Sequence, residues 1–272
     1  MSPVSRLRFL RSELRLVFSR RRNLALLVIL ALVPVLICVA VKVTGPAQHA
    51  GSIFSGITDN GLFAALAAFL VAQPLFVPLV ISVVAGDAVA GEANIGTLRY
   101  LLVVPVGRTR LLGTKFAAVL AWCAVCAVVV AVVGVLVGLA LFPSGELTLL
   151  SGRSVPYSNG LARLAMVTLY VAASTLIVGA IGLFVSTMTE MPLAAMAATL
   201  TLTIVSEVAD AVPQLSSIHG GLPTHYWLGW IDLLRDPIRT ADLRTGLIVA
   251  AIYIGLFLSL AWARMGGKDV TA

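Results

Sequence analysis

Long apolar runs separated by short polar segments form most of this 272-residue chain. A helix needs about 20 consecutive apolar residues to cross the hydrocarbon core of a bilayer, whereas a barrel strand would alternate over about ten residues. The runs have the length of helices. The pattern therefore predicts a single all-α domain, residues 1–272, in which six helices cross a membrane. The expected spans cover about residues 24–43, 61–85, 116–142, 161–185, 192–212 and 246–263.

The first 23 residues follow a different pattern, with apolar and basic side chains on separate faces of a predicted helix. Such a helix suits the plane of the membrane interface. It either braces the first span against a partner or acts as a basic anchor that sets orientation. A cleaved signal peptide fits poorly, because the following apolar run is too long and lacks an A-x-A site. The apolar face holds Leu7, Leu10, Leu14, Val17 and Phe18, and the basic face Arg8, Arg11 and Arg15.

A polar stretch, residues 86–115, interrupts two membrane-length apolar runs and must therefore form a loop at one face of the bilayer. Within it, Leu98, Leu101 and Leu102 fall on one side of a predicted short helix over residues 95–104. Pro105 and Gly107 end that helix. A short amphipathic helix between two spans is a surface on which a partner can act.

This stretch resembles the loop between the second and third spans of bacterial ABC-2-type transporter permeases. An acidic residue, Gly-Thr-Leu, a Leu-rich turn, Pro, Arg and a Lys follow one another in the family's order over about thirty residues. The resemblance implies a coupling helix that docks into a separate ABC ATPase subunit; the alternative is an ordinary loop with solvated charges. The candidate coupling residues are Asp87, Glu92, Gly96, Thr97, Leu98, Arg99, Leu101, Leu102, Pro105, Arg108 and Lys115.

The same resemblance implies a wider assembly. It predicts a permease dimer, of two identical or two related chains, that receives two copies of the ATPase. ATP and Mg²⁺ would then bind to the ATPase, and the N-terminal helix would be the family's elbow helix. Such permeases export amphiphiles, and the short external loops favour a drug-like or lipid cargo. An ATP-independent secondary transporter or channel is the main alternative, followed by an intramembrane enzyme and a plain membrane anchor.

Composition and charge agree with this class. The chain is 60% hydrophobic and 11% charged, with mean hydropathy +1.03, whereas a soluble protein carries about 25% charged residues. The net charge of +7 comes from basic residues at the ends of the apolar runs, which does not suit nucleic-acid binding. Thirteen of the 19 lysines and arginines fall on the side of both termini and the 86–115 loop. That side is therefore expected to be the cytoplasm, in a bacterial cytoplasmic membrane.

The chain shows no recognisable catalytic or cofactor motif, so we expect no enzyme activity and no bound cofactor. It lacks the P-loop sequence G-x-x-x-x-G-K-[ST]. His49, His219 and His225 fall in external loops and are not spaced as a metal site. The three cysteines, Cys38, Cys123 and Cys126, lie inside apolar runs and suit helix packing rather than zinc.

Three polar residues within or near the predicted spans are candidates for a substrate pathway. Gln73 either lines a pathway or hydrogen-bonds another helix. Glu207 and Asp210 share one helix face with Thr203, either at the outer mouth of a path for cationic or polar cargo, or solvated beyond a span that ends near Ile204.

Two further features concern packing. Gly134 and Gly138 form a G-x-x-x-G pair that allows close helix approach. Residues 213–245 form either two short external helices that dip back into the bilayer, as the family resemblance implies, or an amphipathic loop. Tyr226, Trp227 and Trp230 in this segment suit a membrane interface.

Overall fold

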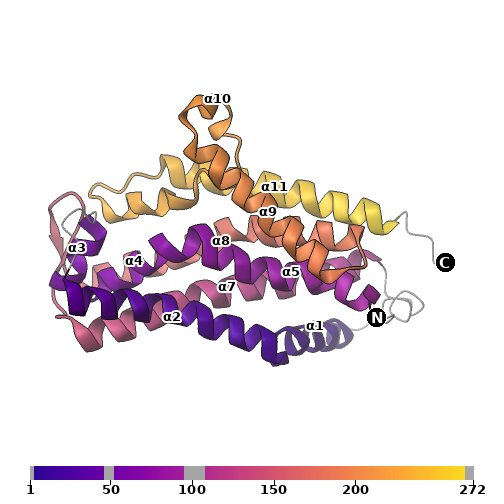
Figure 1. The fold of residues 1–272 in the computed structure, drawn as a ribbon, viewed down its shortest axis with the longest axis horizontal. Coiled ribbons are helices and arrows are strands. Elements are labelled where there is room, and N and C mark those ends of the chain that lie inside the picture. Colours follow the sequence, from indigo (N-terminus) through magenta and orange to yellow (C-terminus); the bar gives the residue numbers. More distant parts are fainter. Residues whose placement is uncertain (1–2, 46–51, 95–107, 267–272) are drawn as a thin grey trace.

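The structure is a computed structural model that describes residues 3–45, 52–94 and 108–266; for residues 3–7, 52 and 108 only the backbone is described. Six of its helical stretches are long and apolar enough to cross a membrane, which confirms the all-α polytopic prediction. They lie side by side in one bundle (Figure 1). The stretches are α2 (Arg21–Thr44), α4 (Leu62–Val71) with η1 (Ala72–Phe76) and α5 (Val77–Asn94), α7 (Arg108–Leu141), α8 (Tyr157–Met188), α9 (Pro192–Ala211) and α11 (Ala241–Gly266).

Short elements connect the spans. The amphipathic helix α1 (Pro3–Ser19) precedes α2, and its arginines at positions 8, 11 and 15 are exposed, as the pattern predicts. The N- and C-termini lie at the same end of the bundle, and α3 lies at the other end (Figure 1). The remaining short elements are α3 (Ser52–Asp59), the antiparallel pair β1 (Leu147–Thr148) and β2 (Ser154–Val155), η2 (Pro213–Leu215), α10 (Ser216–His219) and η3 (Trp227–Leu234).

The helices continue past the apolar runs that defined the predicted spans. The second span was predicted to end at residue 85, but α5 continues to Asn94, and α7 already begins at Arg108. A helix satisfies its own backbone groups in water as well as in lipid, so polarity alone does not end it. Most of the predicted 86–115 loop is therefore helix. The short helix predicted over residues 95–104 lies outside the described residues.

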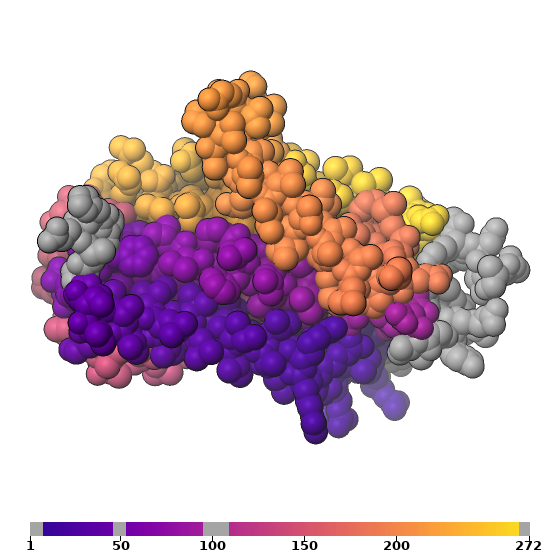
Figure 2. Space-filling model, in the orientation of Figure 1, coloured from indigo at the N-terminus to yellow at the C-terminus, as the bar shows by residue number. Residues whose placement is uncertain are grey.

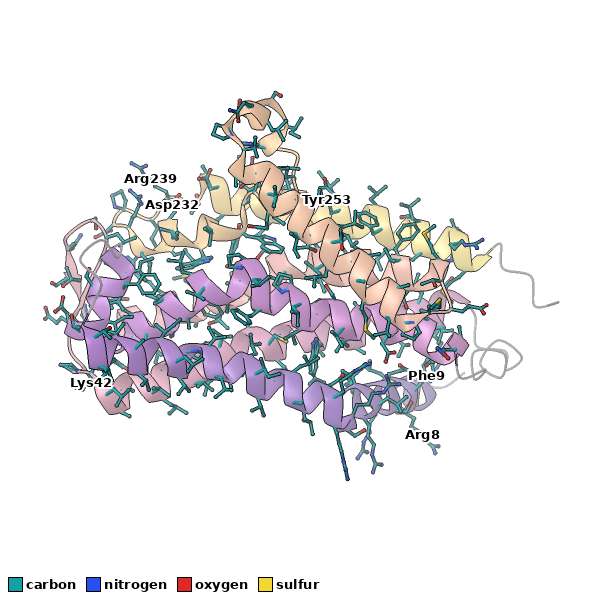
Figure 3. All side chains as sticks on the ribbon, viewed as in Figure 1. Arg8, Phe9, Lys42, Asp232, Arg239 and Tyr253 are labelled. Atoms are coloured by element: carbon teal, nitrogen blue, oxygen red, sulfur yellow. The ribbon has the colours of Figure 1, made fainter. Side chains whose placement is uncertain are left out.

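Spans α4–α5 and α8 form the centre of the bundle, since they are its most buried spans. By contrast, α2, α9 and α11 leave most of their apolar surface uncovered. The side chains of Arg8 and Lys42 mark opposite ends of the bundle (Figure 3). Lys42 donates a hydrogen bond to the Leu141 carbonyl, at 3.0 Å, and lies over the Phe142 ring.

The G-x-x-x-G pair brings α4 and α7 into backbone contact, as predicted. A Cβ atom added to Gly138 would lie 2.1 Å from the carbonyl oxygen of Gly61, and one added to Gly134 would lie 2.6 Å from the Cα of Ala65. Neither neighbour is a flexible side chain that could move aside. The two helices therefore approach as closely as glycine allows.

We expect Gly138→Ala to force α4 and α7 apart and to destabilise the fold by about 1–3 kcal/mol, the usual cost of overpacking. Thermal unfolding of the purified protein in detergent would measure the loss. Gly255→Ala on α11 is the matched control, because a Cβ at Gly255 would meet no atom within 4 Å. Equal stability of the two variants would contradict the assigned contact.

Candidate functional site

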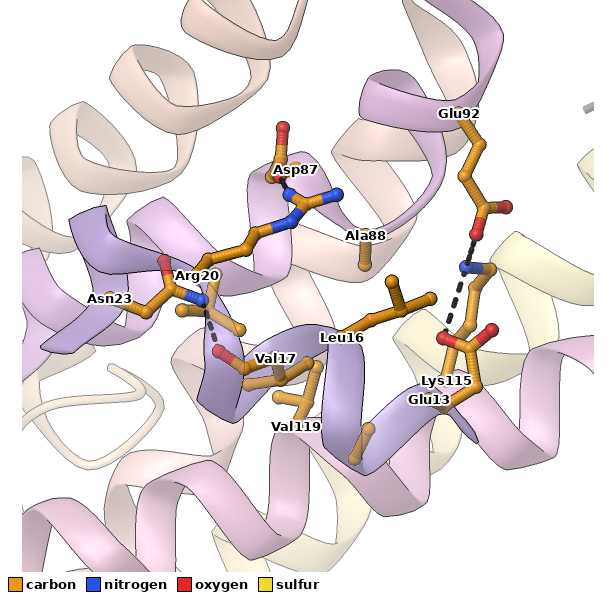
Figure 4. A pocket seen from close by; sticks show the side chains of 12 residues that line it. Glu13, Leu16, Val17, Arg20, Asn23, Asp87, Ala88, Glu92, Lys115 and Val119 are labelled. Atoms are coloured by element: carbon orange, nitrogen blue, oxygen red, sulfur yellow. Dashed lines mark hydrogen bonds and ion pairs between the residues drawn. The ribbon is translucent and has the colours of Figure 1, made fainter. Parts of the chain in front are cut away.

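The candidate coupling residues that the structure describes lie where α1, α2, α5 and α7 meet, at the end of the bundle that holds both termini (Figures 1 and 4). Here the last turns of α5 and the first turns of α7 flank residues 95–107. A small cleft between these helices is lined by charged side chains on both sides. Two ion-pair clusters form its polar walls.

The first cluster is centred on Lys115 of α7. Its Nζ atom donates a hydrogen bond to Oε1 of Glu92 on α5, at 2.6 Å, and also contacts Oε2 of Glu13 on α1, at 3.5 Å. Figure 4 shows Lys115 between the two carboxylates. Lys115 is only 3% exposed, and Glu13 is also buried. Charges removed from water are tolerated when they are paired, so this contact holds three helices in one arrangement.

The second cluster is centred on Asp87, which precedes Glu92 on α5. Its carboxylate accepts hydrogen bonds from Arg20 and, at 3.0 Å, from Nη2 of Arg22. Both arginines belong to the joint between α1 and α2. A Cβ at Gly91 would lie 2.6 Å from Oδ1 of Asp87, so Gly91 provides the space that the carboxylate occupies.

The joint between α1 and α2 has a defined geometry. Arg20 leaves the helical conformation with φ −70° and ψ 123°, and α2 begins at the next residue. The buried amide of Asn23 donates to the carbonyl of Val17, at 2.8 Å, and so bridges the break from one helix to the other. On α1, Phe18 packs its ring against Trp122 of α7, with centroids 5.4 Å apart. Contacts on both sides of the bend therefore hold this joint between α1 and α2 in place.

The end of α5 is also attached to α8 and α9. The hydroxyl of Ser186 on α8 donates to the carbonyl of Gly86, at 2.7 Å, and accepts from the N–H groups of Val89 and Ala90. On the α9 side, a Cβ at Gly86 would lie 2.7 Å from the backbone nitrogen of Met196. This end of α5 therefore contacts α2, α7, α8 and α9 directly.

Three of the predicted coupling residues thus lie in ion-pair clusters, Asp87 in one and Glu92 with Lys115 in the other. Sequence reasoning missed their partners Glu13, Arg20 and Arg22. It also missed Asn23, which bridges α1 and α2, and Ser186 on α8. Glu13 carried a signal, since it is the sole acidic residue of the basic N-terminal segment. Predicted residues outside the described side chains are Gly96, Thr97, Leu98, Arg99, Leu101, Leu102, Pro105 and Arg108.

The hydrogen bonds of Gln73 favour the interpretation that it bonds to other helices over the interpretation that it lines a pathway. The side chain of Gln73 is fully buried. Its Nε2 donates a hydrogen bond to the Trp227 carbonyl, at 3.0 Å, and lies 3.4 Å from Oγ of Ser174. Its Oε1 accepts a hydrogen bond from Nε1 of Trp230, at 2.8 Å. It lies in η1, a π-helical turn that also contains Pro74. Proline has no N–H and its ring clashes with the preceding turn, which accounts for the widened helix here.

The tryptophans of residues 213–245 correct one prediction. Trp227 and Trp230 were expected at a membrane interface, but they are 3% and 0% exposed. They belong to η3, which packs on the bundle, and Tyr170 of α8 donates to the carbonyl of Tyr226 at 2.6 Å. A buried indole N–H usually has a hydrogen-bond partner, and Gln73 supplies the partner of Trp230 from within the core.

Glu207 and Asp210 lie on the same helix as Ile204, because α9 continues to Ala211. Asp210 contacts His225 and His219, and Glu207 is half-buried one turn earlier. The described contacts of Gln73 are with α8 and η3 instead. Gln73 and Asp210 therefore have separate partners.

Comparison with known families agrees with this architecture. The family model described as ABC-2 family transporter protein matches residues 18–206. The chain belongs to the ABC-2 transporter family. The match includes Asp87, Glu92 and Lys115 and ends within α9, and family membership supports a role as a transport permease. None of the curated proteins compared with this ABC-2 family protein matches it.

Proposed function

We propose that this chain is the permease subunit of an ATP-binding-cassette exporter. A separate ATPase subunit would bind ATP and Mg²⁺ and act on residues 95–107, while the permease chain itself carries out no catalysis. The observation that carries the proposal is the attachment of both helices flanking these residues to the elbow through the Lys115 and Asp87 clusters.

The mechanism follows from this attachment. Packed elements have a few discrete arrangements, so a movement imposed on a loop shifts whole helices rather than one segment. Lys115 joins the start of α7 to the end of α5 and to α1, and Ser186 joins the end of α5 to α8. A push on residues 95–107 would therefore displace spans two, three and four, together with the joint between α1 and α2, as one unit.

The assembly and its orientation belong to the same proposal. Two permease subunits would pack through the uncovered apolar faces of peripheral spans, and each would receive one ATPase at the end that holds both termini. The basic residues concentrated at that end support its position in the cytoplasm.

A drug-like or lipid cargo has some support from the bundle surface. Between α7 and α8 lies a groove whose walls are apolar apart from Thr168, and it includes Val128, Leu136 and Leu164. Such a surface suits the apolar part of an amphiphile.

We expect Glu92→Lys to uncouple ATP hydrolysis from transport, because it places a second ammonium where Lys115 now has a carboxylate. The chain, purified in mild detergent with its ATPase, would be reconstituted in vesicles and assayed for ATP hydrolysis and for ATP-driven movement of a fluorescent amphiphile. We expect transport per ATP to fall by about tenfold or more, since a coupling loss of 1.4 kcal/mol corresponds to tenfold.

Two further variants make the result specific. Glu92→Gln keeps a hydrogen-bond acceptor for Lys115 and should retain more transport than Glu92→Lys. Glu146→Lys makes the same charge change at an exposed residue between α7 and β1 and should leave transport unchanged. A chain that purifies without an ATPase and transports without ATP would favour the secondary transporter or channel.

A further inference from the structure

A cluster of three potential metal ligands lies where the chain leaves α9. Asp210 is on the last turn of α9, His219 ends α10, and His225 precedes η3. Nδ1 of His225 lies 2.5 Å from Oδ1 of Asp210, and Nδ1 of His219 lies 3.9 Å from the same oxygen. One potential ligand atom from each residue lies within 4.8 Å of the other two. Residues too widely spaced along the sequence to suggest a metal site thus meet in space.

The segment that carries these residues has little core of its own. It projects from the flank of the bundle (Figures 1 and 2). No residue of η2 or α10 is buried, and Leu215 and Ile218 are exposed. Segments with too little core of their own are commonly stabilised by a metal ion or a disulfide. The cluster joins both ends of this segment, where such a link constrains it most.

The hydrogen bond on the far side of the His219 ring determines which nitrogen faces Asp210. Nε2 of His219 lies 3.1 Å from the carbonyl oxygen of Val212, and a carbonyl can only accept. Nε2 therefore carries the proton, and in the neutral ring Nδ1 presents its lone pair to the Asp210 carboxylate. A lone pair facing an anion is unfavourable unless a proton or a metal cation lies between them. Metal-binding histidines commonly donate their second N–H to a backbone carbonyl in this way.

We propose that Asp210, His219 and His225 bind a divalent transition-metal ion, best matched by Zn²⁺. Two imidazoles and one carboxylate are typical zinc ligands, whereas Mg²⁺ and Ca²⁺ prefer oxygen ligands alone. Tetrahedral coordination with bonds of about 2.0–2.2 Å separates neighbouring ligand atoms by about 3.3 Å, which small side-chain rotations would reach here. All three side chains are partly exposed, at 28%, 18% and 34%, so a water molecule can reach a fourth position.

The bound ion would fix the projecting segment above η3. His225 packs edge-on against Tyr226, with centroids 4.7 Å apart, and the next residue is the buried Trp227 whose carbonyl accepts from Gln73. Tyr253 of α11 donates to the carbonyl of Gly221 on the same segment, at 2.7 Å. The ion would thus brace a structure that already contacts the π-helical turn η1, α8 and α11.

The test is a zinc titration of the full-length chain, purified in detergent through a histidine-free tag, stripped with a chelator and dialysed. A chromophoric indicator would report competition for Zn²⁺. We expect about one ion per chain with Kd of order 1 µM or tighter, and no binding of Mg²⁺ at that concentration. His219→Ala/His225→Ala should weaken binding by at least ~100-fold, more than the loss of a supporting contact.

Three comparisons keep the result specific. His49→Ala removes the remaining histidine of the chain and should bind like the wild type. Asp210→Asn keeps the shape of the ligand but not its charge, and should weaken binding ~10-fold or more even if the double variant folds poorly. Zn²⁺ should also raise the Tm of the wild type but not that of the double variant. Zinc affinity that is unchanged in both Asp210→Asn and the double variant, or absent from the wild type, would overturn the assignment.

Discussion

Replacing Lys115 with methionine is expected to destabilise the protein by about 3–5 kcal/mol, the usual cost of leaving a buried charge without its partner. Methionine fills a similar volume but leaves the carboxylates of Glu13 and Glu92 facing each other across the site. For a chain of this size the Tm should fall by an amount on the order of 10 °C. Thermal unfolding in detergent, followed by intrinsic fluorescence, would measure it.

A combined variant separates stability from coupling. Lys115→Met together with Glu13→Gln and Glu92→Gln removes all three charges, and replacing a whole buried ion cluster by neutral groups is often neutral or stabilising. We expect its Tm to return close to that of the wild type while ATP-driven transport stays low. Wild-type transport by the stable triple variant would show that the cluster only holds the fold together, and the coupling role would be lost.

An exposed lysine provides the matched baseline. Lys42→Met makes the same replacement at the opposite end of the bundle, where the side chain is exposed and donates one hydrogen bond to Leu141. Exposed charge contacts contribute little, typically below about 1 kcal/mol. A Tm loss as large as that of Lys115→Met would contradict the explanation by burial.

The number and approximate positions of the spans could be predicted because hydropathy is a local property of the sequence. The close approach at Gly134 and Gly138 could be predicted for the same reason, since a five-residue motif indicates it. Helix ends could not, because α5 continues beyond its apolar run to Asn94, through Asp87 and Glu92. Backbone hydrogen bonding continues through that boundary and hydropathy does not report it.

The partners at the candidate site could not be predicted, because they are distant in the sequence. Arg20 meets Asp87 and Glu13 meets Lys115 across separations of 67 and 102 residues. Charge alone does not determine such pairs, since each arginine at the bundle end has several possible acids. The cluster of Asp210, His219 and His225 was missed for a related reason. The sequence spacing of the histidines does not match a contiguous metal motif, whereas the turn between α9 and η3 brings them to Asp210 in space.

The second large loss of stability is expected when the buried amide of Gln73 is removed. Gln73→Leu is expected to destabilise the protein by roughly 2–6 kcal/mol, because the Trp230 N–H and the Trp227 carbonyl would lose their partner, and each unsatisfied buried group costs about 1–3 kcal/mol. The Tm in detergent should fall accordingly. Gln214→Leu makes the same replacement at an exposed position of η2 and should leave the Tm nearly unchanged.

A double-mutant cycle with Trp230→Phe decides between the two interpretations of Gln73. Phenylalanine retains a ring that can pack against Phe69 but has no N–H to donate to Gln73. If Gln73 links the π-helical turn to η3, the losses of Gln73→Leu and Trp230→Phe overlap, and the double variant is more stable than their sum predicts. If Gln73 lines a substrate pathway instead, the losses add, and Gln73→Leu changes the KM for transported substrate with little change in Tm. Because one fully buried side chain makes the hydrogen bonds to Trp227 and Trp230, we expect the stability losses of the two single variants to be strongly non-additive.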